Sequence, residues 1–277
     1  IAVVNSWNEV VPGHIHLNVL AKYVKEGVRA AGGTPIEFNT IAICDGIAMG
    51  HKGMRTPLPS RDLIADSVEL MLEAHGFDAA VFICTCDKIV PGMLMAAARV
   101  NIPSIFALGG PMTPGYPQWG RYKGKSITVG ELFEIPALLK RGEVTEEEAK
   151  YLEDIAVAGC GACGGMFTAN TMQALTEALG MTLPYMATRP AELAERQRLA
   201  FEAGSMVIEL LKRDLKPRDI MTREAFENAI RVDLALGGST NTVLHLMAIA
   251  YEAGVPLELD DFDRLSRDTP HLSLIHI

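Results

Sequence analysis

The chain contains 277 residues, of which 49% are hydrophobic and 21% are charged, and its formal net charge is -9. This length and hydrophobic content predict a globular chain with a substantial core, built as one large domain or two smaller ones. The negative net charge and the lack of any basic block argue against binding to nucleic acid or to anionic lipid. A small polar molecule is the partner that fits better.

The distribution of apolar residues and cysteines indicates where the protein works. No apolar run approaches the roughly 18 residues needed to cross a bilayer, so we expect no membrane partner. The chain starts at Ile1 without a secretion signal, and we expect that its natural start is missing. Its five cysteines are an odd number, which argues against a disulfide framework and favours a reducing cytoplasm.

The first part of the chain alternates short apolar runs with helical patterns. Strands are predicted from Ile1 to Val4, from Ile41 to Cys44, from Ala79 to Cys84 and from Pro103 to Leu108. Helices are predicted from Leu17 to Ala31, after Ser60 as N-cap, and from Met93 to Val100. This alternation predicts an α/β fold with a mostly parallel sheet flanked by helices, in which ligands bind beyond the carboxyl ends of the strands.

The second half has almost wholly helical patterns. Segment 113–127 is rich in Gly, Pro, Lys and Tyr and is predicted to be a surface loop. Thr145 and Glu148 form a predicted capping box for the helix that follows them. Further helices are predicted from Met166 to Leu179, Ala191 to Leu215, Arg223 to Ala235 and Thr240 to Ala253. We therefore expect a largely helical second half.

Residues that could bind ligands or take part in catalysis follow the predicted strands directly. They are Asn5, Asp45, Cys86 to Lys88, and Gly109-Gly110. Each alone is explained as a turn former, but the four together predict that they converge on one rim of the sheet.

Two cysteine segments combine soft and hard ligands. Cys86-Asp87-Lys88 places a thiolate beside a carboxylate, which suggests an iron-sulfur cluster next to a hard cation. Cys163 lies in a glycine-rich turn ahead of the helix near Met166, where exposed amides are expected to favour its thiolate. The Cys160-x-x-Cys163 spacing also fits a redox motif or half of a zinc site. Cys84 lies within an apolar run and is predicted to be core.

Oxygen ligands and a lysine accompany these thiols. Asp45 and Asp87 could share one Mg²⁺ ion, which the Lys88 ammonium would repel. Three roles are therefore open for Lys88. Its ammonium balances the charge of the substrate from a distance, or its amine is chemically converted to an anionic ligand, or it is an ordinary surface lysine. Gly237-Gly238-Ser239-Thr240-Asn241 is either an anion site or a plain helix start.

A series of longer motifs carries a family resemblance. They are Val4-Asn5-Ser6-Trp7-Asn8, Val11-Pro12-Gly13-His14, Glu37-Phe38-Asn39-Thr40, Cys44-Asp45-Gly46-Ile47-Ala48-Met49-Gly50-His51, Leu58-Pro59-Ser60-Arg61, Cys86-Asp87-Lys88, Pro91-Gly92-Met93, Asn101-Ile102-Pro103, Gly109-Gly110-Pro111-Met112, Cys160 to Asn170, and Gly237 to Asn241. At these residues the chain closely resembles the N-terminal half of the dihydroxy-acid dehydratase family, whose wider group includes phosphogluconate and sugar-acid dehydratases.

The resemblance implies a hydro-lyase that converts 2,3-dihydroxy-3-methyl carboxylic acids to 2-keto acids in valine and isoleucine synthesis. It implies that Cys86 and Cys163 bind an iron-sulfur cluster, either 2Fe-2S or 4Fe-4S. It also implies that Asp45, Asp87 and a carbamylated Lys88 bind Mg²⁺, and that full-length chains form a homodimer.

The chain departs from the family in three ways. Glycine stands at position 13, where members with a defined third cluster cysteine carry it, so Cys160, Cys44 or a non-cysteine group is left as the third ligand. Family chains are about twice this length, and their proton-abstracting serine, a further Mg²⁺-binding glutamate and a β-rich domain lie in the absent part. The resemblance stops near Leu272, so we expect one truncated domain over residues 1–272, inactive alone, and a foreign tail over 273–277.

Three alternative functions are weighed against this assignment. Within the family, the alternative is a phosphogluconate or sugar-acid dehydratase. From other classes, the alternatives are an electron-transfer iron-sulfur protein and a zinc-stabilised binding module. The electron-transfer alternative leaves Asp45, Asp87 and Lys88 without a purpose.

Overall fold

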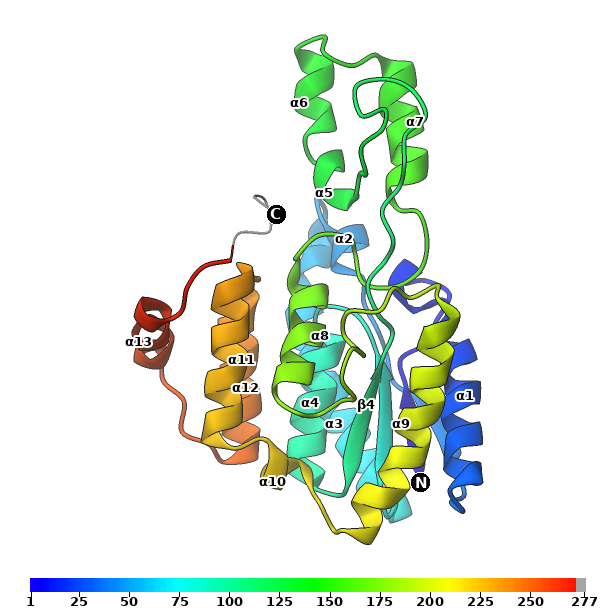
Figure 1. The fold of residues 1–277 in the computed structure, drawn as a ribbon, viewed down its shortest axis with the longest axis vertical. Helices are drawn as coiled ribbons and strands as arrows, with labels where there is room; N and C mark the ends of the chain where they lie inside the picture. Colours follow the sequence, from blue (N-terminus) through cyan, green and yellow to red (C-terminus); the bar gives the residue numbers. More distant parts are fainter. Residues whose placement is uncertain (273–277) are drawn as a thin grey trace.

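A parallel β-sheet forms the centre of the computed structural model, which describes residues 1–272. Its strands are β1 (Ala2–Asn5), β2 (Ile36–Asn39), β3 (Ala80–Cys84) and β4 (Ser104–Leu108), in the order β2-β1-β3-β4 (Figure 1). Ala2 lies opposite both Ile36 and Ala80, and Ala80 lies opposite Ser104. The predicted α/β fold with a parallel sheet is confirmed.

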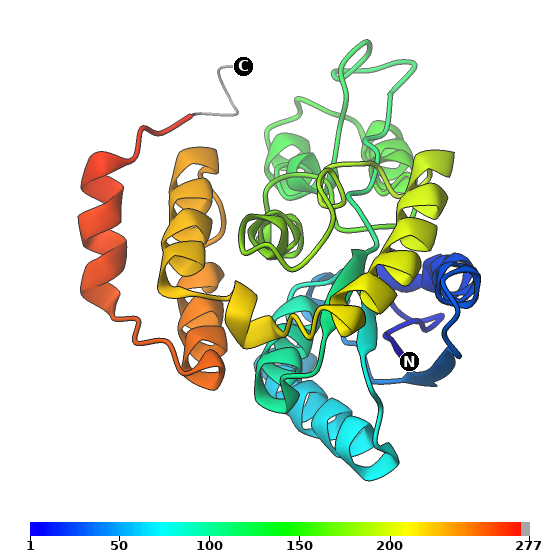
Figure 2. The same ribbon diagram turned by 60° about the horizontal axis from the view of Figure 1, so that its bottom comes forward.

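Helices cover both faces of the sheet, which explains why β3 and β4 are buried along their whole length. α1 (Leu17–Ala30) and α9 (Ala194–Lys212) lie side by side on one face, and α3 (Pro57–His75) and α4 (Ile89–Val100) cover the other (Figure 2). α1 and α9 approach closely because glycines stand at their contact. A Cβ on Gly204 would lie 2.1 Å from the Val24 carbonyl oxygen.

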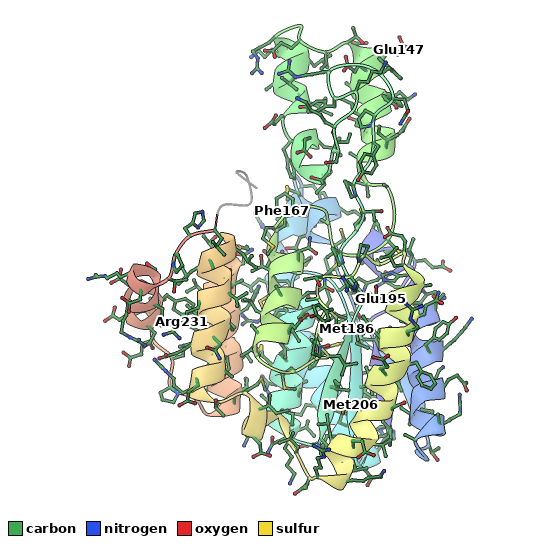
Figure 3. All side chains as sticks on the ribbon, in the orientation of Figure 1. Glu147, Phe167, Met186, Glu195, Met206 and Arg231 are labelled. Carbon is green, nitrogen blue, oxygen red and sulfur yellow. The ribbon has the colours of Figure 1, made fainter. Side chains whose placement is uncertain are left out.

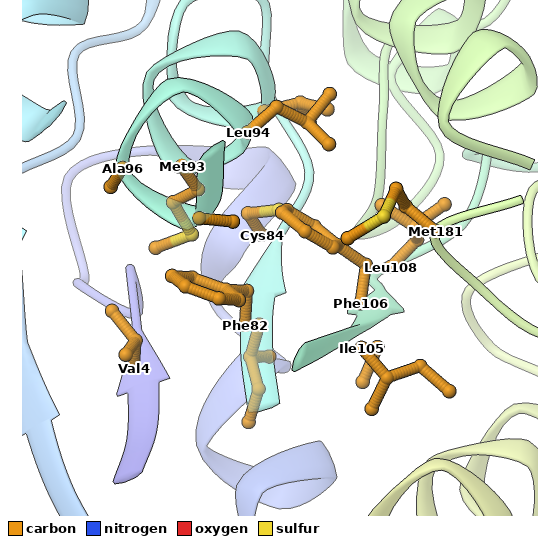
Figure 4. Packing of buried hydrophobic residues seen from close by; sticks show 14 of the residues in the cluster. Val4, Phe82, Cys84, Met93, Leu94, Ala96, Ile105, Phe106, Leu108 and Met181 are labelled. Carbon is orange, nitrogen blue, oxygen red and sulfur yellow. The ribbon is translucent and has the colours of Figure 1, made fainter. Parts of the chain in front are cut away.

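The core between β3, β4 and α4 is closely packed (Figure 4). The rings of Phe82 and Phe106 stack with centroids 4.9 Å apart. Met93 and Cys84 are fully buried beside them. The prediction that Cys84 is a core residue is therefore confirmed, and burial raises the pKa of its thiol well above the usual range.

A helical layer continues outward from α4, which confirms the largely helical second half. It contains α8 (Thr168–Ala178), α10 (Pro217–Ile220), α11 (Arg223–Leu236), α12 (Asn241–Ala253) and α13 (Leu259–Asp268). α12 packs on α4, α11 on α8, and α13 on α11. None of the helices in residues 1–272 combines the length and the apolar character that a membrane span requires.

A buried arginine ties α9 to the chain that follows β4. The side chain of Arg196 is fully buried, and its guanidinium donates to the carbonyl oxygens of Leu108 (2.9 Å), Met186 and Arg189. Burial lowers its pKa to about 10. Three carbonyl acceptors thus stabilise a charge that has no carboxylate within hydrogen-bond distance among the described residues.

A smaller unit rises from the carboxyl end of the sheet (Figure 1). This projecting unit, residues 113–161, contains α5 (Val129–Leu132), α6 (Ile135–Lys140) and α7 (Glu146–Ala156). It has a core of its own, made of Ile127, Ile135, Ala149, Leu152 and Ala156. A bridge between Pro111 and Ala162 closes its base.

Two local predictions are wrong. Residues Ile41 to Cys44 form no strand, because the sheet edge is β2 and the chain beyond it leads directly into α2 (Asp45–Ala48). Ser60 is not an N-cap, because Pro57 starts α3 three residues earlier and the Ser60 hydroxyl donates to the Pro57 carbonyl oxygen.

The predicted capping box is only half formed. The Thr145 hydroxyl accepts a hydrogen bond from the Glu148 backbone N–H, as expected for an N-cap. The reciprocal bond is absent from α7 because the Glu148 carboxylate accepts the Arg121 N–H instead. The remaining predicted helices and strands lie within a few residues of the observed ones, and segment 113–127 is a loop with one bridge between Gly115 and Ile127.

Candidate functional site

The candidate site lies where the strand order changes direction. The chain passes from β1 to β2 on one side and from β3 to β4 on the other, which opens a crevice beyond the carboxyl ends of β1 and β3. A cavity of about 660 Å³ lies at this end of the sheet. Its thiol, charged and polar lining residues are Cys44, Asp45, Cys86, Asp87, Lys88, Cys163, Thr168, Ser239, Thr240, Asn241 and His245.

Cys86 is held at the rim by a buried histidine. The Cys86 backbone N–H donates to His14 Nε2 over 3.2 Å, and His14 Nδ1 lies 2.7 Å from the Ser6 carbonyl oxygen. These two contacts require a neutral ring with its proton on Nδ1. Burial lowers the pKa of His14 to about 4, so the ring keeps this neutral state.

Cys163 reaches the cavity on a separate loop. The Ala162 N–H donates to the Gly110 carbonyl oxygen (2.8 Å), which ties the loop to the end of β4. The Asn170 side-chain amide, from the first turn of α8, donates to the carbonyl oxygens of Cys163 and Gly165, both at 2.7 Å. Cys163 is therefore fixed from both sides.

Three thiols share the cavity, those of Cys44, Cys86 and Cys163. Burial raises the pKa of Cys86, and charge on Cys163 and Cys44 raises it further. Burial and Cys44 likewise raise the pKa of Cys163. The expectation that a helix N-terminus favours the Cys163 thiolate is wrong, because α8 begins only at Thr168 and burial dominates. Electropositive iron would have to supply the stabilisation that the chain does not.

Asp45 and Asp87 converge on the amine of Lys88. The Nζ atom lies 3.0 Å from Asp45 Oδ2 and 2.7 Å from Asp87 Oδ1, and Lys88 is only 6% exposed, so it is not a surface lysine. Burial and the Asp87 charge raise the pKa of Asp45. Burial opposes ionisation of Asp87, but the His245 ring and the Lys88 ammonium outweigh it and hold the pKa of Asp87 below its usual range.

His245 completes this cluster, although no motif in the sequence singles it out. It comes from α12, is fully buried, and its Nε2 atom lies 3.7 Å from Asp87 Oδ1 without a hydrogen-bond partner. Asp45 Oδ1 is also buried and unpartnered. Such orphaned polar atoms are costly unless another group binds them. They fit a cation with oxygen ligands at the place where the two carboxylates meet.

The lining residues fit both metal groups by chemistry, but they are not arranged around a single ion. Among residues 1–272, no three His, Cys, Asp or Glu side chains converge as the ligands of one metal would. At the candidate Mg²⁺ site, the Lys88 ammonium itself lies between the carboxylates of Asp45 and Asp87. The candidate cluster site does not need such convergence. Thiols that hold an iron-sulfur cluster stand further apart than the ligands of a single ion, because several irons and sulfides separate them.

Another part of the cavity lining, the apolar wall, consists of hydrophobic side chains. It contains Met49, Met54, Leu58, Val129, Phe133, Met166, Phe167 and Leu244. Phe133 belongs to the projecting unit, and its ring meets Phe167 edge to face with centroids 6.3 Å apart. Phe167 lies where that unit meets α8 (Figure 3). Among the described lining residues, Lys88 is the only lysine or arginine.

The start of α12 lines the cavity between these two regions. The hydroxyls of Thr168 and Ser239 lie 2.7 Å apart, and the Asn241 side-chain amide donates to Thr168 Oγ1 over 3.0 Å. This network holds the segment that the sequence offered as an anion site. A helix N-terminus with polar side chains suits a carboxylate.

The structure brings together every residue predicted for the site: Asp45, Cys86, Asp87, Lys88 and Cys163. Of the two cysteines left open as a further ligand, Cys44 lines the cavity and Cys160 does not. Burial raises the pKa of the Cys160 thiol, and the charge on Glu192 raises it further, whereas no other thiol contributes. His14 and His245 were missed as positioning groups.

Comparison with known proteins identifies the family. The sequence model described as dihydroxy-acid/6-phosphogluconate dehydratase, N-terminal, matches residues 1–276. The chain is 60% identical over 273 residues to the dihydroxy-acid dehydratase of Pyrococcus furiosus, covering 99% of this chain and 49% of that protein. It is 57% identical over 272 residues to that of Moorella thermoacetica, covering 98% of this chain and 48% of that protein.

These matches agree with the resemblance in the motifs. The chain spans about half the length of the curated relatives it matches. The cavity at the strand-order reversal, with its thiols and carboxylates, and the match over nearly all of its residues together show that this chain belongs to the dihydroxy-acid/6-phosphogluconate dehydratase family.

Proposed function

We propose that this chain forms the metal-binding half of a dihydroxy-acid dehydratase. The reaction removes the C2 proton and the C3 hydroxyl of a 2,3-dihydroxy-3-methyl carboxylic acid as water. The resulting enol becomes the 2-keto acid without net oxidation or reduction. The product belongs to the route to valine and isoleucine.

One observation carries this proposal: a single cavity joins three thiols, a carboxylate pair and an apolar wall. Cys86 and Cys163 would hold an iron-sulfur cluster, and Asp45, Asp87 and Lys88 would hold Mg²⁺. When bound, the two groups supply Lewis acidity toward the departing hydroxyl and toward the carboxylate end of the substrate. Neither role needs an electron-transfer partner, so the chemistry suits an elimination.

The chain's own residues bind and orient the substrate. The start of α12, with Ser239 and Asn241, faces the cavity and would receive the carboxylate. Phe133 and Phe167 would enclose the branched alkyl group and exclude water. Among the described lining residues we assign no base for the C2 proton, and we propose that a serine outside this chain supplies it.

The apolar wall favours a branched-chain acid over the phosphorylated sugar acid of the same family. A phosphate needs cationic or multiple N–H partners, and Lys88 is already paired with two carboxylates. Phe133 and Phe167 would leave the hydroxyls of a sugar acid without partners, a cost of about 1–3 kcal/mol for each buried group. The cost of burying these hydroxyls would therefore favour the branched-chain acid over the phosphorylated sugar acid.

Carbamylation of Lys88 would remove the repulsion between its ammonium and Mg²⁺ at the candidate Mg²⁺ site. The neutral amine adds CO₂, releases a proton to solvent and becomes an anionic carbamate between Asp45 and Asp87. Mass spectrometry under native conditions, or ¹³C NMR after incubation with labelled bicarbonate, tests this modification. A signal that persists in the Lys88→Met variant would contradict the assignment.

A substrate panel on the full-length protein tests the function. We expect turnover of 2,3-dihydroxyisovalerate and little of 6-phosphogluconate; the reverse preference would refute the proposal. The chain alone, after anaerobic cluster reconstitution, is expected to bind metal without turnover. Turnover by the chain alone would show that it carries its own base.

Mg²⁺ binding by the chain provides a separate test. Asp87→Asn should weaken Mg²⁺ binding by at least about tenfold, because Mg²⁺ depends on one or two carboxylates for its protein contacts. Asp263→Asn, on the exposed side of α13, is the matched control and should bind normally. Titration calorimetry measures both, and equal affinities would remove Asp87 from the site.

We also propose a cytoplasmic location and a homodimer of the full-length protein. The five cysteines are all free thiols, which suits a reducing compartment. Sedimentation of the full-length protein would test the dimer, and a monomer at micromolar concentration would contradict it.

A further inference from the structure

We infer that Cys44 supplies the third thiolate of the iron-sulfur cluster, an inference that rests on the proposed function. On binding, the Cys44 thiol releases its proton to solvent and its sulfur bonds to iron. No oxidant or reductant is consumed in this step.

The position of Gly13 shows why another residue must provide this ligand. A Cβ built on Gly13 would lie 3.0 Å from Cys86 Sγ and 2.8 Å from the Gly161 carbonyl oxygen. Position 13 therefore faces the Cys86 thiol directly, but glycine offers no donor there. The cluster must take its third protein ligand from another wall of the cavity.

The remaining cysteines are separated by their surroundings. Cys84 is fully buried within β3 and does not line the cavity. Cys160 lies outside the cavity lining, and Glu192 closes the space beside it, because a Cβ on the adjacent Gly159 would lie 2.3 Å from Glu192 Oε1. Cys44 is half-buried and lines the cavity together with Cys86 and Cys163.

Neighbouring contacts fix Cys44 at the cavity. Its carbonyl oxygen accepts the Ala48 N–H over 3.1 Å at the start of α2, and the next residue, Asp45, is bound to Lys88. These contacts hold the backbone of Cys44 at the edge of the cavity. Asp45 Oδ1 and His245 Nε2, in the same cavity, are buried without a hydrogen-bond partner, which is an independent observation that favours a bound group in this region.

The assignment reveals a repeated arrangement of ligands. Cys44-Asp45 and Cys86-Asp87 each place a soft ligand directly before a hard one, on two loops that meet at the same cavity. Each loop then contributes one thiolate to the cluster and one carboxylate to Mg²⁺. Cys163 adds the remaining thiolate from a third loop, so two of the three cluster ligands are joined to Mg²⁺ ligands by one peptide bond.

Alkylation of the reconstituted chain tests this inference without any substitution. The chain is treated with iodoacetamide before and after cluster loading, and each cysteine is scored by peptide mass spectrometry. Loading should slow alkylation of Cys44 at least about tenfold, because a thiolate bound to iron is no longer a free nucleophile. Cys160, which is also half-buried, should react equally in both states and serves as the internal control.

The outcomes separate this inference from the proposed function. Protection of Cys86 and Cys163 without protection of Cys44 would overturn the inference and leave the cluster site in place. Alkylation of all three in the loaded chain would overturn both. Protection of Cys160 instead of Cys44 would assign the third ligand to Cys160.

A pair of variants provides the second readout. Cys44→Ser should lose bound iron and sulfide to a chelator at least about tenfold faster than the original chain, while Cys160→Ser should lose them at the original rate. Visible absorption follows the loss in real time. Equal rates for the original chain and Cys44→Ser would contradict the inference.

Discussion

Replacement of His14 by asparagine tests how the site is held in place. The asparagine amide can still donate to the Ser6 carbonyl oxygen, but it is too short to accept the Cys86 N–H that His14 Nε2 now binds. A buried N–H that loses its acceptor costs about 1–3 kcal/mol. We therefore expect His14→Asn to be less stable at about pH 7.5 by this amount.

The same substitution should also change the pH dependence of stability. The pKa of His14 is lowered to about 4 in the folded chain, against about 6.5 when unfolded. Below about pH 6.5 the unfolded chain therefore binds the proton more readily, and stability falls until about pH 4. When the pH falls from about 7.5 to about 5.5, His14 alone lowers the free energy of unfolding by about 1.3 kcal/mol.

Urea unfolding of the cluster-free chain at the two pH values, followed by circular dichroism, measures this effect. His16 and His245, whose pKa values burial also lowers, remain in both proteins, so the difference between the proteins isolates His14. The destabilisation caused by His14→Asn should shrink by about 1.3 kcal/mol at the lower pH. His75→Asn, at an exposed position, is the control. The same destabilisation at both pH values would refute the assignment of a buried neutral ring.

Three further substitutions test the packing and the substrate wall. Arg196→Leu should lower the free energy of unfolding by about 3 kcal/mol, since three carbonyl oxygens lose their donor; a loss below about 1 kcal/mol in urea unfolding would contradict this role. Gly204→Ala should cost about 1–3 kcal/mol by forcing α1 from α9, whereas Glu202→Ala on the exposed side should cost little. Phe133→Ser in the full-length protein should reduce kcat/KM for 2,3-dihydroxyisovalerate by about 10–100-fold, and an unchanged value would remove Phe133 from the wall.

The strand pattern predicted where most of the site lies. Cys86 to Lys88 follow β3 directly, so their place at the carboxyl end of the sheet could be read from the apolar run before them. Asp45 reached the same rim for a different reason. No strand ends directly before it, and α2 and the contact with Lys88 hold it there instead.

Other features depend on tertiary contacts that no local pattern encodes. The sequence does not distinguish Cys44 from Cys160 as candidate ligands. In the structure, the bridge between Pro111 and Ala162 orients the loop so that Cys163 lines the cavity and Cys160 does not. His245 is a single histidine in a helix distant in the sequence, and only the packing of α12 on α4 brings it to Asp87.

The separate core of the projecting unit has a consequence for how the family can diversify. Ile135, Leu152 and their neighbours form a core for that unit apart from the central sheet, yet Val129 and Phe133 from it line the cavity. Substitutions there can alter which side chain the cavity accepts while the loops that carry the thiols and carboxylates keep their geometry. Under the proposed function, substrate range and metal chemistry can thus evolve separately within one chain.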